Sequence, residues 1–347
     1  MTNNTNDVLS EPEIQVNKKL IDDTIINFLP KTHSIQEIDL LYNMMRDYPL
    51  RPAKGIRSSI CLFTCQAFGG QVNDALLTAS SLELFQNWIL IHDDIEDESE
   101  FRRGQPVLHR KHTIPLAINA GDSLHGRMWS LLQNNHSLLG ADITLNIIDE
   151  FINMLNETTE GQHMELSWSN TNDWDISQDD YFIMCTKKTS WYTCITPFRL
   201  GNMIANKHTI DENKFVEFGT NLGIAFQIRD DILNLTADGK YGKEYAGDLI
   251  EGKRTLILIH LLESCNNSDR EFIESFFNNN REFREGNYQQ LLDLISKYKS
   301  LDYATNICNE LSEKALTEFN NIFSDLPDTR ARLLLNNITK YMVSRNW

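Results

Sequence analysis

The chain has 347 residues, of which 41% are hydrophobic and 23% are charged, with only 16 Gly and 8 Pro. So few Gly and Pro residues argue against a turn-rich sandwich or barrel and favour a helical protein. The 49 acidic residues outnumber the 32 basic ones, and the net charge of −17 argues against a nucleic-acid binder. An anionic substrate would need a local group of cations or bound metal ions.

The first 12 residues are polar and acidic, and we expect them to form a disordered tail. They lack the basic start and the apolar stretch of a signal peptide, and the chain has no run of about 18 apolar residues. Cys61 and Cys65 stand four positions apart in an apolar run, which favours buried helical thiols over a disulfide or metal site. These features predict a cytoplasmic protein without a transmembrane segment.

Apolar residues recur at helical spacing through most of the chain, whereas the alternation typical of strands is not found. The segment 76–97 is apolar on nearly all sides, which indicates a helix buried on most of its surface. We expect a single all-α domain over residues 13–347. In chain order, the predicted helices span residues 35–45, 60–68, 76–97, 117–132, 143–167, 178–203, 214–235, 256–263, 269–277, 288–298, 303–323 and 329–342.

The segment His92-Asp93-Asp94-Ile95-Glu96-Asp97 ends the apolar helix 76–97. Asp93 and Asp97 are about one helical turn apart, so their carboxylates project from one face. Acids this close repel one another unless cations lie between them. Hard oxygen ligands of this kind suit Mg²⁺, which shares its coordination sphere with substrate phosphates. The alternative is a solvated acidic helix end.

A second acidic segment, Gln227-Ile228-Arg229-Asp230-Asp231-Ile232-Leu233-Asn234, also lies on an apolar helix. Asp230 and Asn234 share one face of that helix. Two acidic faces on hydrophobic helices suggest two walls that face one cavity. An apolar cavity with carboxylates at its mouth fits a ligand with an apolar tail and a polyanionic head.

Basic residues accompany both acidic segments in the sequence, some directly after them. Arginine binds phosphates bidentately and lysine acts as a point charge. Any one of these residues could be an ordinary surface charge, but their joint occurrence indicates a diphosphate site. They are Lys54, Arg57, Arg102, Arg103, Lys187, Lys188, Lys243, Lys253 and Arg254.

Taken in this order, the segments resemble the trans-isoprenyl diphosphate synthases, all-α prenyltransferases that join isopentenyl diphosphate to an allylic diphosphate. The resemblance covers about residues 50–260 and implies an orthogonal helical bundle around a central apolar cavity, assembled as a homodimer. Besides the two acidic segments, it rests on Lys54-Gly55-Ile56-Arg57, Arg102-Arg103-Gly104-Gln105-Pro106, Asn119-Ala120-Gly121-Asp122, Gly161-Gln162, Lys188-Thr189, Gly242-Lys243 and Gly252-Lys253-Arg254-Thr255.

The resemblance also implies a mechanism of allylic ionisation, addition and proton loss, in which the leaving diphosphate takes the proton. It implies three Mg²⁺ ions, two at Asp93 and Asp97 and one at Asp230. The metal ligands implied are Asp93, Asp94, Asp97, Asp230 and Asp231. The catalytic residues implied are Asp93, Asp97, Arg102, Lys188, Thr189, Gln227, Asp230 and Lys243. The substrate-binding residues implied are Lys54, Arg57, Gln86, Arg103, Tyr192 and Lys253.

The sequence departs from the family pattern in both the acidic and the basic segments. Asn234 stands where many members have a third Asp, which puts its metal contact in doubt. Gly55 and Ser58 stand where a basic residue and a Pro are common. A class I terpene cyclase and a non-catalytic subunit of a heteromeric synthase are the alternatives. A cyclase would not need the cations near Lys54, and a non-catalytic subunit usually lacks one acidic segment.

Trp88 lies five positions before Asp93 and is followed by Ile89. In this family, a large residue at this place blocks the growing tail. The resemblance therefore implies a product of fifteen to twenty carbons, with geranylgeranyl diphosphate favoured over farnesyl diphosphate. The alternative is that Trp88 packs against a neighbouring helix or a dimer partner. His92 is expected to pack beside Asp93 rather than to act as a base.

Overall fold

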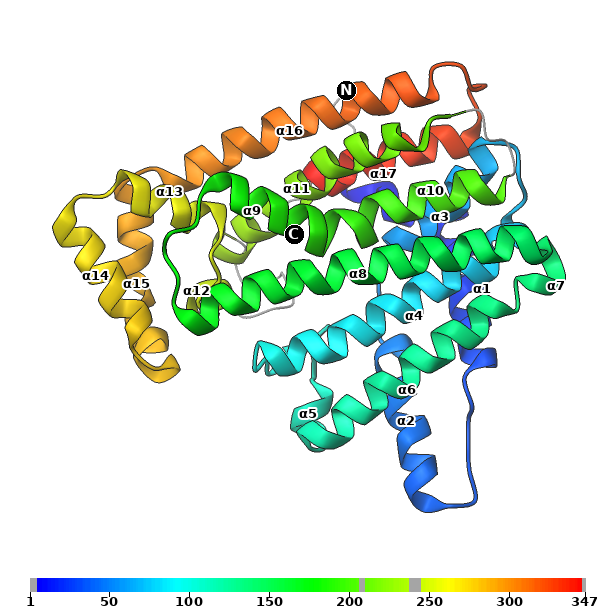
Figure 1. Cartoon of the computed structure of the whole chain (residues 1–347), viewed down its shortest axis with the longest axis horizontal. Helices are drawn as coiled ribbons and strands as arrows, with labels where there is room; N and C mark the ends of the chain where they lie inside the picture. The colour runs from blue at the N-terminus through cyan, green and yellow to red at the C-terminus, as the bar shows by residue number, and fades with distance from the viewer. Residues whose placement is uncertain (1–4, 206–209, 237–244, 345–347) are drawn as a thin grey trace.

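The computed structural model describes residues 5–205, 210–236 and 245–344, and most of them lie in helices (Figure 1). This confirms the expected all-α class. The elements are η1 (Thr5–Ser10), α1 (Pro12–Phe28), α2 (Gln36–Leu50), α3 (Ile56–Ala67), α4 (Val72–Glu96), β1 (Phe101–Arg102), β2 (Gln105–Pro106), α5 (Leu108–Lys111), α6 (Ile114–Gln133), α7 (His136–Leu139), α8 (Ala141–Thr171), α9 (Gln178–Cys185), η2 (Thr186–Ile195), α10 (Thr196–Ile204), α11 (Glu212–Thr236), α12 (Gly247–Glu251), α13 (Leu256–Ser264), α14 (Asn267–Asn278), α15 (Arg281–Lys297), α16 (Ser300–Phe323) and α17 (Arg330–Ser344).

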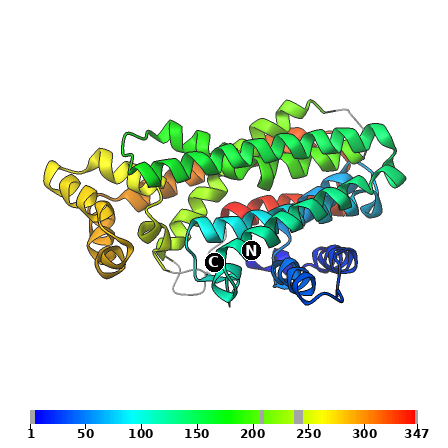
Figure 2. The ribbon, with the colours of Figure 1, turned by 60° about the horizontal axis from the view of Figure 1, so that its bottom comes forward.

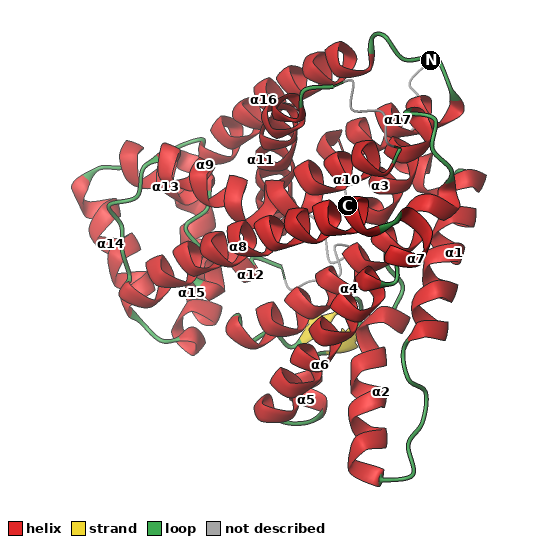
Figure 3. Ribbon diagram, turned by 45° about the vertical axis from the view of Figure 1, so that its right-hand side comes forward, coloured by secondary structure: helices red, strands yellow, loops and turns green. Residues whose placement is uncertain are grey.

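Strands β1 and β2 form a short antiparallel hairpin in which Phe101 pairs with Pro106, drawn in yellow in Figure 3. The hairpin follows α4 directly and turns the chain back. Arg102 of β1 thereby returns to the end of α4, where its side chain contacts the first acidic segment. The two strands thus position a predicted cation rather than build a sheet of their own.

Each predicted helix is present with shifted ends, except that the segment 178–203 is not a uniform α-helix. Its middle, η2, is a π-helix between α9 and α10. The wider turns of π-helices are frequent at functional sites. Two glycines allow close packing against η2. A Cβ atom at Gly161 of α8 would lie 2.2 Å from the Lys188 nitrogen, and one at Gly223 of α11 would lie 2.2 Å from Ser190 Oγ.

The N-terminal part of the chain holds two elements that the sequence did not predict. Residues 5–10, within the expected tail, form the 3₁₀-helix η1, which contacts α17. Helix α1 escapes prediction because few of its residues are apolar and buried, chiefly Ile14, Ile21 and Ile25. These three side chains nevertheless form one stripe of α1 that faces the core.

Two clusters of buried apolar side chains form the core. Helices α1, α3 and α10 contribute to both clusters. One cluster also draws on α9, α11, α13, α16 and α17, and the other on α2, α4, α6 and α8. Cys61 and Cys65 of α3 are free thiols in this core, as predicted.

Helix α11 packs against both η2 and α16, and α4 packs against α3 and α6. Figures 1 and 2 show α13, α14 and α15 together at one end of the molecule. Every residue from Thr78 to Phe85 is buried, which explains the apolar character of the whole of α4. Within the ranges that the structure describes, none of the helices combines the length and apolarity needed to span a bilayer.

Candidate active site

A cavity of about 720 Å³ is lined by residues of α3, α4, α8, η2 and α11. Asp93, near the end of α4, and Asp230, on α11, both belong to its lining. The two acidic segments therefore lie on two walls of one cavity, as their sequences suggest. Buried helices place these carboxylates at the cavity because the opposite faces of α4 and α11 pack into the core.

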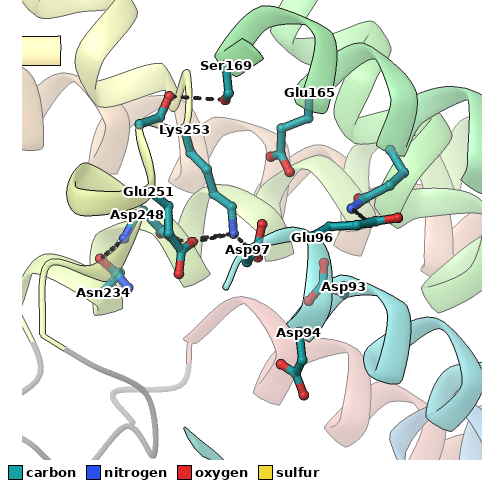
Figure 4. A network of polar contacts seen from close by, with 12 residues as sticks. Asp93, Asp94, Glu96, Asp97, Glu165, Ser169, Asn234, Asp248, Glu251 and Lys253 are labelled. Atoms are coloured by element: carbon teal, nitrogen blue, oxygen red, sulfur yellow. Dashed lines mark hydrogen bonds and ion pairs between the residues drawn. The ribbon is translucent and has the colours of Figure 1, made fainter. Parts of the chain in front are cut away.

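The aspartates of α4 point in different directions. Asp93 lines the cavity, and the backbone N–H of Asp97 donates to the Asp93 carbonyl oxygen at 2.9 Å, which closes the last helical turn. Figure 4 shows Asp97 turned towards Lys253 and Asp94 pointing away from it. Asp94 is fully buried. In this segment Asp93 and Glu96 thus line the cavity, and Asp97 contacts Lys253 of the lining.

Arg102 is the cation that compensates the first acidic segment. Its Nη2 lies 3.1 Å from Asp93 Oδ2, and its Nε donates to Asp94 Oδ1 at 2.8 Å. Burial alone would lower the pKa of Arg102, but the charges of Asp94 and Asp93 raise it. Arg102 therefore stays charged and holds a fixed orientation at the cavity wall.

Lys253 lies in the loop after the second acidic segment and contacts the end of the first. Its Nζ donates to Asp97 Oδ2 at 2.6 Å and lies 2.8 Å from Glu251 Oε2, as Figure 4 shows. Burial alone would lower the pKa of Lys253, but the charges of Asp97 and Glu251 hold it well above its usual value. The loop that carries Lys253 follows α12 and the second acidic segment, so this contact holds that loop against the end of the first segment.

Lys188 extends from the π-helix η2 into the same polar region. Its Nζ pairs with Glu165 of α8 and lies 3.9 Å from Asp93 Oδ1. Burial alone would raise the pKa of Glu165, but the charges of Lys188 and Lys253 lower it. The cavity thus carries three cations close to the aspartates of the first wall, namely the buried Arg102 and the half-buried Lys188 and Lys253.

A second group of cations lies nearer to α3. Arg57 is 8% exposed, its guanidinium stacks 4.3 Å from the ring centre of Tyr192, and its Nη2 donates to Thr193 Oγ1 at 2.8 Å. Arg103 donates to the carbonyl oxygen of Tyr48 at 3.1 Å and to Asn87 Oδ1 at 3.2 Å. Lys54, Gln86 and Arg103 complete this side of the lining.

Two hydroxyl groups, an amide and a carboxylate form a hydrogen-bonded chain at the second wall. Thr189 donates to Gln227 Oε1 at 2.8 Å, and Gln227 Nε2 donates to Asp231 Oδ1 at 2.8 Å. Tyr181 donates to Asp231 Oδ2 at 2.7 Å. Burial and the charge of Asp248 raise the pKa of Asp231 to about 8, whereas the two hydrogen bonds favour its ionised form.

Aromatic rings lie on the apolar side of α4. Trp88 and Ile89 both line the cavity. The ring of Trp88 stacks on His125 of α6, with centroids 3.9 Å apart and planes 6° from parallel, and Trp129 donates to His125 Nε2 at 2.9 Å. His92 lies 3.5 Å from Asp122, where it packs against α6.

The carboxylate oxygens of Asp93, Asp97 and Asp230 are of the type that suits a hard cation such as Mg²⁺. Among the described residues, no three His, Cys, Asp or Glu side chains are clustered tightly enough to hold a metal ion by themselves. Mg²⁺ usually binds through one or two carboxylates together with substrate phosphates. The donor set fits a metal that enters with a diphosphate.

Comparison with known proteins identifies the family. A model of the polyprenyl synthetase family matches residues 38–295. This chain belongs to the polyprenyl synthetase family. As a member of this family of trans-isoprenyl diphosphate synthases, it is a prenyltransferase. The match includes both acidic segments and every cation group of the cavity.

Curated relatives and solved structures agree with the family. The geranylgeranyl diphosphate synthase of Sulfolobus acidocaldarius is 32% identical over 312 residues, which cover 89% of this chain and 93% of the relative. The geranylfarnesyl diphosphate synthase of Natronomonas pharaonis is 27% identical, covering 97% of this chain and 98% of the relative. The crystal structure of geranylgeranyl pyrophosphate synthetase from Pyrococcus horikoshii is 30% identical, with a TM-score of 0.85, and covers 98% of this chain and 99% of that structure.

The structure brings most of the predicted site residues of this prenyltransferase together around one cavity. Asp94 lies behind the wall, Asp97 contacts Lys253 of the lining, and Lys243 falls outside the described residues. Those in the lining are Lys54, Arg57, Gln86, Trp88, Ile89, Asp93, Arg102, Arg103, Lys188, Thr189, Tyr192, Gln227, Asp230, Asp231 and Lys253.

Sequence reasoning missed the acidic and tyrosine partners of these residues, namely Tyr48, Glu165, Tyr181, Asp248 and Glu251. One signal was available for Glu165, since it stands one turn after Gly161-Gln162 on the same helix. Asp248 appears near Asn234, whose Oδ1 accepts the Asp248 N–H at 3.2 Å. The amide oxygen of Asn234 is thereby engaged at the start of α12, in keeping with the doubt about its metal contact.

Proposed function

We propose that this prenyltransferase joins isopentenyl diphosphate to an allylic diphosphate and releases a product of fifteen to twenty carbons, with geranylgeranyl diphosphate favoured. The observation that carries the proposal is a single cavity with acids on two walls, cations between them and aromatic rings on its apolar side. A polyanionic head would bind among the charges while a hydrocarbon tail lies along α4.

Divalent metal ions belong to this proposal, and we assign Asp93, Asp97 and Asp230 to hold three Mg²⁺ together with the allylic diphosphate. When bound, Mg²⁺ supplies positive charge that neutralises the diphosphate. Asp94 and Asp231 are buried and have both carboxylate oxygens in hydrogen bonds, so the proposal leaves them out of the ligand set.

The protein's own cations would hold the leaving group. Breaking the allylic C–O bond builds negative charge on the diphosphate, so stabilisation must come from preorganised positive groups. Arg102, Lys188 and Lys253 are charged and already fixed by carboxylates, Arg102 buried and the two lysines half-buried. We assign Lys243 to the same diphosphate from its sequence position alone.

The other substrate, isopentenyl diphosphate, would bind to the cations near α3. Arg57 and Arg103 are both largely buried, and Lys54 and Gln86 lie in the same part of the lining. Oxygen dipoles of Thr189, Tyr192 and Gln227 would stabilise the allylic cation. The leaving diphosphate would take the proton, since it is the nearest base with newly developed charge.

Product length follows from the depth of the apolar part of the cavity. The relatives named above carry two different product names, so membership of the family leaves the length open. Trp88 supports the shorter products because its large ring lies in the lining next to Ile89, and its stack on His125 restrains it from moving aside.

A homodimer is also part of the proposal. Helices α6 and α8, which contact each other, expose large apolar side chains that a monomer would leave in water. They include Ile114, at 50% exposed, and Leu145, at 58%. A symmetric partner packed on this face would cover both helices at once. Light scattering on the purified chain tests this assembly.

A turnover assay tests the function. The purified chain is incubated with labelled isopentenyl diphosphate, one allylic diphosphate at a time, and Mg²⁺, and the dephosphorylated products are separated by chromatography. Elongated linear products support the proposal. Cyclic hydrocarbons would instead indicate a class I terpene cyclase, and a lack of turnover by the pure chain would indicate a non-catalytic subunit.

A further inference from the structure

Each acidic segment contains two neighbouring aspartates, and the second of each pair is buried. Neighbouring residues on an α-helix are turned by about 100° from each other, so both cannot point at the same ligand. Asp93, Asp230 and Asp231 belong to the cavity lining, but Asp231 is only 4% exposed, and Asp94 is 0% exposed and lies behind the lining. The question is what two buried carboxylates do beside a diphosphate site.

A buried tyrosine from another helix holds one oxygen of each second aspartate. Tyr48 of α2 donates to Asp94 Oδ2, and Tyr181 of α9 donates to Asp231 Oδ2 at 2.7 Å. Tyr48 is 0% exposed and Tyr181 is 1% exposed. A phenol buried this deeply needs an acceptor, and the carboxylate supplies it. Each pair therefore ties a neighbouring helix to an acidic segment.

The other oxygen of each second aspartate holds a side chain of the cavity wall. Asp94 Oδ1 accepts from Arg102 Nε at 2.8 Å, and Asp231 Oδ1 accepts from Gln227 Nε2 at 2.8 Å. The two walls thus repeat one arrangement, in which a tyrosine, a buried aspartate and a cavity-facing donor follow one another. The tyrosines come from different helices and the donors are different residue types. What the two walls share is a pair of neighbouring aspartates on a helix, which explains the repeated arrangement.

We propose that Asp94 and Asp231 are positioning residues, which act through Arg102 and Gln227 and are themselves anchored by Tyr48 and Tyr181. This rests on the proposed function, because it assigns roles within the same diphosphate site. In each pair, the first aspartate faces the metal-bound head of the substrate, and the second fixes a neighbouring group that meets the substrate directly.

The two positioning residues have different effects on the reaction. Asp94 aligns the planar guanidinium of Arg102, whose Nη2 reaches Asp93 Oδ2 at 3.1 Å on the diphosphate side. Asp231 fixes which end of the Gln227 amide faces Thr189. With Nε2 held by Asp231, Oε1 accepts the Thr189 hydroxyl, and the lone pairs of that hydroxyl remain available to an allylic cation.

The test compares three tyrosine variants of the full-length enzyme. Tyr181→Phe and Tyr48→Phe each remove one anchoring hydroxyl and keep the ring. Tyr298→Phe is the matched control, because Tyr298 donates to Asp269 Oδ2 at 2.6 Å away from the cavity. Asp230→Asn serves as the comparison for loss of a metal ligand. Steady-state kinetics, the share of allylic substrate released as alcohol, and calorimetric titration of Mg²⁺ in inorganic pyrophosphate are measured for all four.

Loss of a partner behind a ligand typically costs about 10–100-fold in activity. We expect Tyr181→Phe to lower kcat by this amount and to increase the alcohol released, because a misoriented Thr189 protects the cation less well. We expect Tyr48→Phe to lower kcat without more alcohol released, because a misaligned Arg102 stabilises the charge that develops on the diphosphate less well. Neither variant should change Mg²⁺ affinity by more than about twofold, whereas Asp230→Asn should weaken it by about tenfold or more.

Two results would overturn the inference. One is that Tyr181→Phe or Tyr48→Phe weakens Mg²⁺ binding as much as Asp230→Asn does. This would show that the second aspartate of the pair is a metal ligand. The other is kinetics equal to those of Tyr298→Phe, since that makes the anchor merely structural. If Tyr181→Phe unfolds, Asp231→Asn keeps an oxygen for Gln227 and provides the same comparison. Absence of prenyl transfer by the unmodified enzyme would reject the proposed function, while the Mg²⁺ titrations would still decide the ligand assignment.

Discussion

The Nζ atom of Lys253 lies 2.6 Å from Oδ2 of Asp97, although the two residues are 156 positions apart in the sequence. This ion pair brings the loop after the second acidic segment to the end of the first. The same ammonium also neutralises Glu251, at 2.8 Å. Lys253 thus supplies positive charge between acids that would otherwise repel one another, at the place where a diphosphate head would bind.

The first prediction concerns the carboxylates of the two walls. Asp93→Ala or Asp230→Ala should lower kcat/KM by about 100-fold or more, because each removes a group that stabilises charge in the transition state. Asn234→Ala should cost much less, since its amide oxygen accepts the Asp248 N–H at 3.2 Å. Equal losses at all three positions in steady-state assays would show that Asn234 belongs to the ligand set.

The second prediction separates the two diphosphate sites. Arg57→Ala should raise KM for isopentenyl diphosphate by about tenfold with a smaller change in kcat, because that contact binds ground and transition states alike. Lys188→Ala should mainly lower kcat, because its partner gains charge during ionisation. Arg270→Ala, on an exposed ion pair with Glu274, is the control and should leave both constants unchanged. If Arg57→Ala instead lowered kcat and Lys188→Ala raised KM for isopentenyl diphosphate, the assignment of the two diphosphate sites would be reversed.

The sequence predicted which acidic residues come to the cavity because their spacing is local. Asp93 and Asp97 follow from helical spacing on an apolar helix, and both are near the cavity. Their partners were missed because tertiary contacts alone determine them. Tyr48 is 46 residues from Asp94, and Tyr181 is 50 residues from Asp231.

The π-helix escaped prediction for a similar reason. Its apolar pattern fits an α-helix, and the wider turn becomes visible only where Gly161 and Gly223 bring two other helices against it. The hairpin of β1 and β2 was missed because strands of two residues leave no alternating pattern in the sequence. The position of Arg102 against Asp94 depends on that hairpin, so the cation was predicted and its geometry was not.

The third prediction tests the close contact between α8 and η2. Gly161→Ala should lower the free energy of unfolding by about 1–3 kcal/mol, because the new methyl group would meet the Lys188 backbone nitrogen. The displaced backbone carries Lys188, so kcat should fall as well. Gly126→Ala is the matched control, since no atom lies within 4 Å of its added methyl group. That variant should gain about 0.5–1 kcal/mol, and denaturant unfolding measures both. An unchanged stability in Gly161→Ala would contradict the contact.

The fourth prediction concerns pH and the stack between α4 and α6. Burial lowers the pKa of His125 from its usual 6.5, and its Nε2 accepts a hydrogen bond from Trp129. As pH falls below about 6.5, the unfolded chain takes up a proton that the folded ring resists, so this stabilising contribution is lost. The stability difference between the unmodified protein and His125→Gln should therefore be smaller at about pH 5.5 than at about pH 7.5. Urea unfolding at both pH values decides it, and an unchanged difference would show that folding does not lower the pKa of His125.

The last prediction concerns product length and uses Trp88, which lines the cavity and stacks on His125. In a closed core, Trp88→Ala would leave a void and cost about 3–5 kcal/mol. In a cavity that holds the hydrocarbon tail, the vacated volume would admit a longer chain, so we expect products with at least one more isoprene unit. Phe276→Ala, in the core away from the cavity, is the control and should lose stability without any change in product length. Chromatography of the dephosphorylated products checks this, because an unchanged length from folded Trp88→Ala enzyme would place the floor of the cavity elsewhere.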